Sequence, residues 1–69
     1  MITTEAQLQQ AIEQIQRLCR ALNSLRVDIF PQNPKNFAIL AEGPVDEIRK
    51  LQAEIDAYIS GLEGVDASA

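Results

Sequence analysis

The chain has few side chains of the kinds that perform chemistry: it contains one cysteine, one tyrosine and no histidine. A reactive thiol needs exposure and an electropositive setting, but Cys19 falls on an apolar helical stripe, so we predict a small buried hydrophobe. Tyr58 falls on a second such stripe, and we expect a core or interface residue with its hydroxyl at the rim. Neither residue is predicted to be catalytic.

Acidic residues are the other candidates, because carboxylates bind divalent cations. Their spacing matches no EF-hand loop, and a zinc site is not expected without histidine or a cysteine pair. Asp46 precedes Arg49 and Lys50 by three and four residues, which is typical of a solvated, salt-bridged helix face. We therefore predict no metal, no cofactor and no enzyme activity, since two helices form no cleft for acid–base catalysis. The acids considered are Glu42, Asp46, Glu47, Glu54 and Asp56.

Apolar residues recur every three or four positions along two segments of similar length, which places each set on one face of a helix. Ala11, Leu18 and Leu25 lie beside the first set and widen it, as packing against more than one helix requires. We predict that both stripes form an interface. Its residues are Leu8, Ile12, Ile15, Cys19, Leu22, Ile48, Leu51, Ile55, Tyr58 and Ile59.

Capping signals delimit the two helices. Thr4 with Gln7 three residues later forms a capping box, which predicts a helix over about 5–28. Pro31 disfavours a helical conformation at the preceding residue and so ends the first helix. Asn33-Pro34 is typical of an N-cap followed by proline at the first helical position. A second helix is predicted over about 34–60, ended by Gly61 in a left-handed conformation. We expect an antiparallel all-α hairpin over 1–60 and a flexible C-terminal tail over 61–69.

Gly43-Pro44 lies inside the second predicted helix and allows two interpretations. Proline in a helix interior costs about 3 kcal/mol, which favours a break and two shorter helices. The apolar spacing nevertheless keeps its phase across Pro44, through Phe37 and Ala41. We favour one continuous helix kinked near Pro44, with the broken form left open.

Association is the expected source of stability. A chain of 69 residues has little core, and one cysteine allows no intrachain disulfide. Two hairpins packed through their stripes would form a four-helix bundle, most simply a homodimer.

Charge limits the classes of partner. The net charge of −4 disfavours nucleic acid and anionic membranes. No apolar run reaches the length of a membrane span, and the N-terminus lacks the pattern of a signal peptide. Cytoplasmic residence is expected.

Two segments resemble a bacterial pattern: M-I-x-T-E-x-Q-L at the start, and R-K-L-Q-A-E-I-D-A-Y-I near the end. They resemble the N-terminal helical hairpin of small antitoxin-like regulators, in which an Xre-type helix-turn-helix domain follows. The resemblance implies an interaction module without its DNA-binding domain, and an alternative function as a regulatory module that binds and masks a protein partner. The matching residues are Met1, Ile2, Thr4, Glu5, Gln7, Leu8, Ile48, Leu51, Ala53, Glu54, Ile55 and Tyr58.

Overall fold

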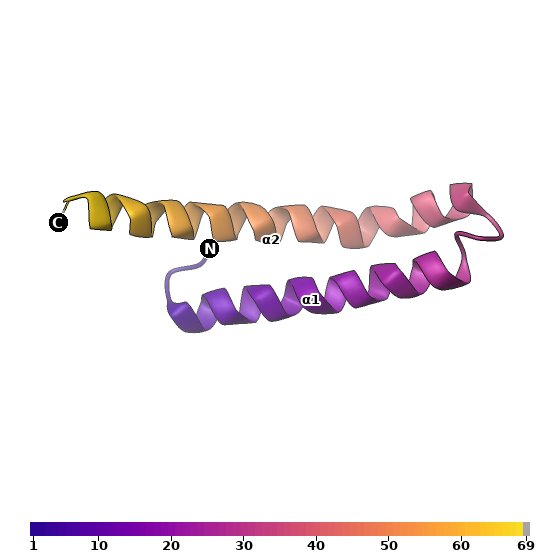
Figure 1. Cartoon of the computed structure of the whole chain (residues 1–69), viewed down its shortest axis with the longest axis horizontal. Coiled ribbons are helices and arrows are strands. Elements are labelled where there is room, and N and C mark those ends of the chain that lie inside the picture. Colours follow the sequence, from indigo (N-terminus) through magenta and orange to yellow (C-terminus); the bar gives the residue numbers. More distant parts are fainter. Residues whose placement is uncertain (69) are drawn as a thin grey trace.

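Two antiparallel helices form the fold in a computed structural model, which describes residues 1–68, with side chains through Glu63. Helix α1 spans Glu5–Asp28 and helix α2 spans Pro34–Ser68. They lie side by side along most of α1, and α2 continues past the start of α1 (Figure 1). No strand occurs in the part of the chain that the structure describes. The predicted all-α hairpin is confirmed.

The start of α1 follows from its capping residues. The Thr4 hydroxyl accepts a hydrogen bond from the Gln7 N–H at 3.2 Å, as an N-cap does. The Gln7 side chain reaches back one residue further than a capping box requires. Its Oε1 accepts from the Thr3 N–H at 2.7 Å and from the Thr3 hydroxyl at 2.9 Å. This contact ties the residues that precede the helix to its first turn.

The turn between the helices is closed by backbone bonds and by one aromatic pair. The Ile29 carbonyl accepts from the N–H groups of Gln32 and Asn33 at 3.1 and 2.8 Å. The Asn33 side chain then caps α2 by accepting from the Asn36 N–H at 3.0 Å. Phe30 and Phe37 meet edge to face with ring centroids 5.4 Å apart. These contacts hold the second helix antiparallel to the first.

Helix α2 runs through Gly43-Pro44 without interruption, so the broken alternative is wrong and the predicted continuity is confirmed. The kink expected near Pro44 stays a prediction. Pro44 leaves the Leu40 carbonyl without its usual helical donor. Gly43 lowers the steric cost of continuing the helix into Pro44. A side chain before proline disfavours the helical conformation partly through its Cβ, and glycine has none. Figure 1 shows one helical ribbon across this point.

The predicted end of the second helix near Ser60 is wrong, because α2 extends to Ser68. Gly61 lies inside the helix, and no glycine of the described chain has a positive φ. Glycine permits the left-handed conformation of a helix end but does not require it. A Cβ at Gly61 would meet nothing within 4 Å, so continuing the helix creates no steric conflict.

A regular line of contacts between the helices, here called the seam, holds the hairpin together. Its residues repeat with alternating steps of three and four on each helix, the spacing of a coiled coil. All of them are buried or half-buried. The seam consists of Leu8, Ala11, Ile15, Leu18, Leu22 and Leu25 from α1, its C-cap residue Ile29, and Phe37, Ala41, Pro44, Ile48, Leu51, Ile55 and Tyr58 from α2.

The hairpin is long and thin, measuring 55 × 18 × 15 Å. Its radius of gyration is 15.8 Å, whereas a compact domain of this length has about 11 Å. Only Ile2, Ala11 and Ala41 are buried apolar residues among those described. Neither helix, over the described residues, has the length and apolarity needed to span a bilayer. The fold thus leaves much apolar surface exposed.

Candidate interaction surface

The seam divides the surface of the hairpin into two sides. Successive residues of a helix are rotated by about 100° about its axis. Gln14, one position before the seam residue Ile15, and Cys19, four positions after it, therefore lie on opposite sides of the seam. Because the two helices are antiparallel and face each other, residues with the same place in the three-and-four repeat of α1 and of α2 lie on the same side of the hairpin. One side, the arm side, has Gln7, Gln14, Ala21 and Asp28 from α1, and Leu40, Glu47, Glu54 and Gly61 from α2. The other, the open side, has Glu5, Ile12, Cys19 and Arg26 from α1, and Ala38, Val45, Gln52 and Ile59 from α2.

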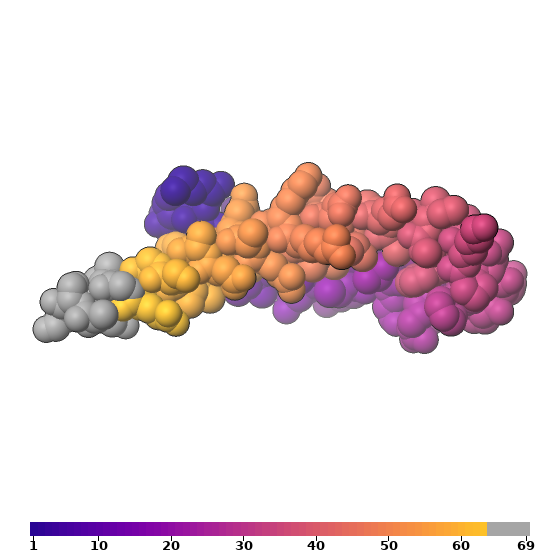
Figure 2. Space-filling model, turned by 90° about the horizontal axis from the view of Figure 1, so that it is seen from above, coloured from indigo at the N-terminus to yellow at the C-terminus, as the bar shows by residue number. Residues whose placement is uncertain are grey.

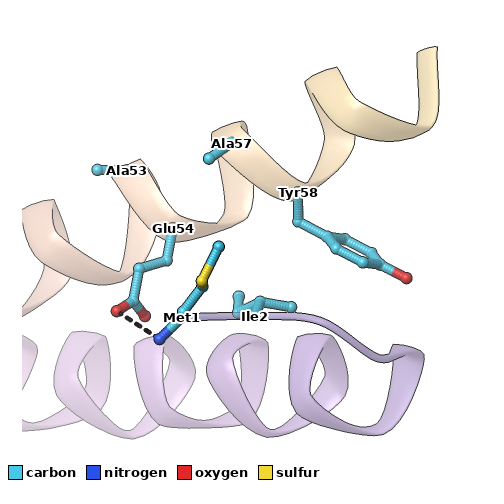
Figure 3. Close-up of a pocket in the computed structure, with 6 residues that line it drawn as sticks. All are labelled: Met1, Ile2, Ala53, Glu54, Ala57 and Tyr58. Carbon is cyan, nitrogen blue, oxygen red and sulfur yellow. Dashed lines mark ion pairs between the residues drawn. The ribbon is translucent and has the colours of Figure 1, made fainter. Parts of the chain in front are cut away.

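An N-terminal arm, residues 1–3, covers part of the arm side (Figure 2). The amino group of Met1 lies 3.5 Å from the Glu54 carboxylate on α2. Thr3 bonds to Gln7 on α1. Ile2, between these anchors, is 9% exposed. The arm therefore bridges the two helices on this side (Figure 3).

A hollow lies beneath the arm, beside the ion pair of Met1 and Glu54. It measures about 370 Å³ and is lined by Met1, Ile2, Ala53, Glu54, Ala57 and Tyr58. The Glu54 carboxylate in its wall already faces the Met1 ammonium group (Figure 3). The remaining wall is largely apolar. This arrangement holds the arm in place.

No residue that the structure describes covers the open side, and its side chains are mainly apolar. Ile12 is 43% exposed and Ile59 is 42% exposed. Cys19 is a free, exposed cysteine on the same side. The charged residues of this row are Glu5 and Arg26, which lie at opposite ends of α1. Between them lie Ile12 and Cys19, and transferring such apolar side chains out of water lowers the free energy.

Two shallow hollows follow this side along α1. The first measures about 420 Å³ and lies in its first half. Leu8 and Ile12 line it together with four polar residues, Glu5, Gln9, Glu13 and Gln16. The second measures about 280 Å³ and lies beside Cys19, Leu22 and Phe37. Side chains of another helix fill hollows of this kind when helices pack. We therefore regard the open side as the candidate interaction surface.

The ten predicted interface residues divide between the seam and the open side. Ile12, Cys19 and Ile59 lie on the open side, and the expectation that Cys19 is buried is wrong for the single hairpin. The other seven belong to the seam: Leu8, Ile15, Leu22, Ile48, Leu51, Ile55 and Tyr58. Seven seam residues were not among the ten, namely Ala11, Leu18, Leu25, Ile29, Phe37, Ala41 and Pro44. A spacing of seven residues identifies them in the sequence. Ala11, Leu18 and Leu25 recur at this spacing, and the others continue rows of predicted residues at the same spacing.

The remaining polar groups pair locally along the helix surfaces. Arg49 lies 3.9 Å from Asp46, and Lys50 lies 3.5 Å from Glu47. All four side chains are more than half exposed, so each pair contributes little stability. Among the described residues no three histidine, cysteine or acidic side chains gather as metal ligands would. These contacts describe a solvated surface.

Comparison with known proteins found no matching family model, no matching curated protein and no matching solved structure.

Proposed function

We propose that this chain is a non-catalytic oligomerisation protein, in which two hairpins pair through their open sides to form a four-helix bundle. The observation that carries the proposal is the uncovered apolar row beside the seam. A helix that packs against one neighbour needs a narrow apolar stripe, and a helix in a bundle needs a wider one. Helix α1 has the wider one, because Ile12 and Cys19 adjoin the seam residues Leu8, Ile15 and Leu22.

The exposed area of the chain supports its pairing with a second copy. The chain exposes 5253 Å², whereas a compact protein of the same mass exposes about 4,300 Å². The difference is close to the roughly 800 Å² that each partner buries in a stable complex of standard size. If two copies buried this area by joining their open sides, the exposed area of each copy would be close to that of a compact protein of its mass.

The arm supports the choice of side. It covers the arm side with Ile2 and brings the Met1 ammonium group to Glu54. A second hairpin approaching there would have to displace the arm and cover charged groups, which costs free energy. On the open side the approach covers Ile12, Val45 and Ile59 and displaces none of the residues that the structure describes.

The experiment is light scattering across a dilution series on the unmodified chain and on two matched variants. Ile12→Asp introduces a charge in the middle of the open side, so we expect the dimer to be lost at micromolar concentration. Ile39→Asp makes the same change at another exposed isoleucine of a helix, outside the seam and the open side. We expect its mass to equal that of the unmodified chain.

A monomeric unmodified chain would overturn the proposal. In that case the open side would serve a different protein, as in the antitoxin-like alternative, and a partner should co-purify with the untagged chain from its native source. Equal loss of mass in Ile12→Asp and Ile39→Asp would also count against the open side, because it would show a non-specific effect of the added charge.

A further inference from the structure

Resting on the proposed dimer, the geometry points to one arrangement of its subunits: α1 packs antiparallel on α1 of the partner subunit about a two-fold axis between Ile15 and Gln16. In that arrangement Glu5 lies beside Arg26 of the partner subunit, and the same pair forms again at the other end of the contact. The inference concerns a second copy of this chain as the occupant of the open side.

The positions of the charges carry this inference. On the open side of α1 the order is acid, apolar, thiol, base: Glu5, Ile12, Cys19 and Arg26. Glu5 and Arg26 are 21 residues apart, and Ile12 and Cys19 are seven apart. Both pairs share the midpoint between Ile15 and Gln16. A two-fold axis at that midpoint therefore sets each acid beside a base and each isoleucine beside a thiol.

The alternative stacking places α1 on α2 of the partner subunit. The row that α1 would then face contains no charged residue, since it consists of Ala38, Val45, Gln52 and Ile59. Glu5 and Arg26 would gain no opposite charge from that row. Antiparallel pairing of α1 with itself matches both charges and keeps the apolar residues in the centre, so electrostatic complementarity selects it.

Neither charge is already committed within the hairpin. Both side chains are exposed. Arg26 donates a hydrogen bond from Nε to the Asn23 side chain at 3.1 Å, which leaves its terminal nitrogens available. Glu5 forms no ion pair among the described residues. Both groups are therefore free to meet a partner at the rim of the contact.

A charge-reversal cycle tests the arrangement, with the dimer dissociation constant measured by sedimentation equilibrium at low ionic strength. We expect Glu5→Arg and Arg26→Glu each to weaken the dimer about tenfold, because each single variant places like charges together at both ends. The double variant restores opposite charges, and we expect its dissociation constant to lie within about threefold of the unmodified value. Added salt should shrink all these differences.

The cycle separates the contact from effects on the helix itself. Both single changes oppose the helix dipole, so a purely intrahelical effect would make the double variant weaker than either single one. Glu47→Lys with Lys50→Glu is the matched control, because this exposed ion pair of α2 includes Glu47 of the arm side and lies away from the open side. We expect this control to dimerise like the unmodified chain.

The outcomes distinguish this inference from the proposed function. A dimeric unmodified chain with rescue in the double variant supports the arrangement. A dimeric unmodified chain whose double variant is weaker than both single variants overturns the arrangement and leaves the dimer standing. A monomeric unmodified chain overturns both.

Discussion

At the scale of single residues, the arm shows how a cap extends its influence. Gln7 accepts from Thr3 rather than from Thr4, so the first turn of α1 also fixes the residue after Ile2. Ile2 in turn is one of the three buried apolar residues of the described chain. A local signal for the start of a helix thereby positions an apolar side chain against the other helix.

Thr4→Ala should reduce the free energy of unfolding by about 1 kcal/mol, because the Gln7 N–H loses its side-chain acceptor at the helix start. Thr3→Ala is the matched control. It removes only the exposed hydroxyl contact with Gln7 and keeps the backbone bond at 2.7 Å. Its cost should stay within about 0.5 kcal/mol.

Urea unfolding followed by circular dichroism at one fixed protein concentration measures both values, since stability of an oligomer depends on concentration. A larger loss in Thr3→Ala than in Thr4→Ala would show that the hydroxyl contact of the arm, and not the N-cap, stabilises this end.

At the scale of helices, the sequence predicted the boundaries that side-chain chemistry determines. Thr4, Asn33 and Pro34 each satisfy or remove a backbone N–H at a helix start, so α1 and the beginning of α2 were predicted correctly. The end of α2 was not, because Gly61 imposes no conformation of its own. Continuity across Pro44 depended on the preserved apolar phase, and Gly43 supplied the steric freedom.

Gly61→Ala should stabilise the protein by about 0.5–1 kcal/mol, because alanine has the higher helix propensity and its Cβ would enter open space. Gly43→Ala is the informative comparison. Its Cβ also meets no distant atom, but it would crowd the ring of Pro44, which disfavours the helix. We expect its stability to lie below that of Gly61→Ala.

Helicity by circular dichroism and the unfolding midpoint, at equal concentration, give the comparison. Destabilisation by Gly61→Ala would show that α2 ends at Gly61 in solution, since alanine is unfavourable only in the left-handed conformation.

At the scale of the whole molecule, periodicity alone did not separate the seam from the open side. On α1 the rows through Ala11 and Leu18 and through Ile12 and Cys19 share the same spacing and the same neighbours at Leu8, Ile15 and Leu22. The structure places the first row inside the hairpin. That row continues to Leu25, so it offers more apolar area to α2, whereas the second ends at the charged Arg26.

Folding and pairing should be coupled in this chain. The hairpin buries three apolar residues of those described, and its other apolar contacts are half-exposed. Ordering a residue costs about 1–2 kcal/mol of backbone entropy, so the seam alone provides little net stability. We expect dilution to lower the helical circular dichroism signal and the scattering mass together, and the thermal midpoint to rise with protein concentration.

Ile15→Asp should abolish both the helical signal and the dimer mass at every concentration, because Ile15 belongs to the seam and adjoins the open side. Mass that falls on dilution while helicity stays constant would show instead that one hairpin is stable by itself.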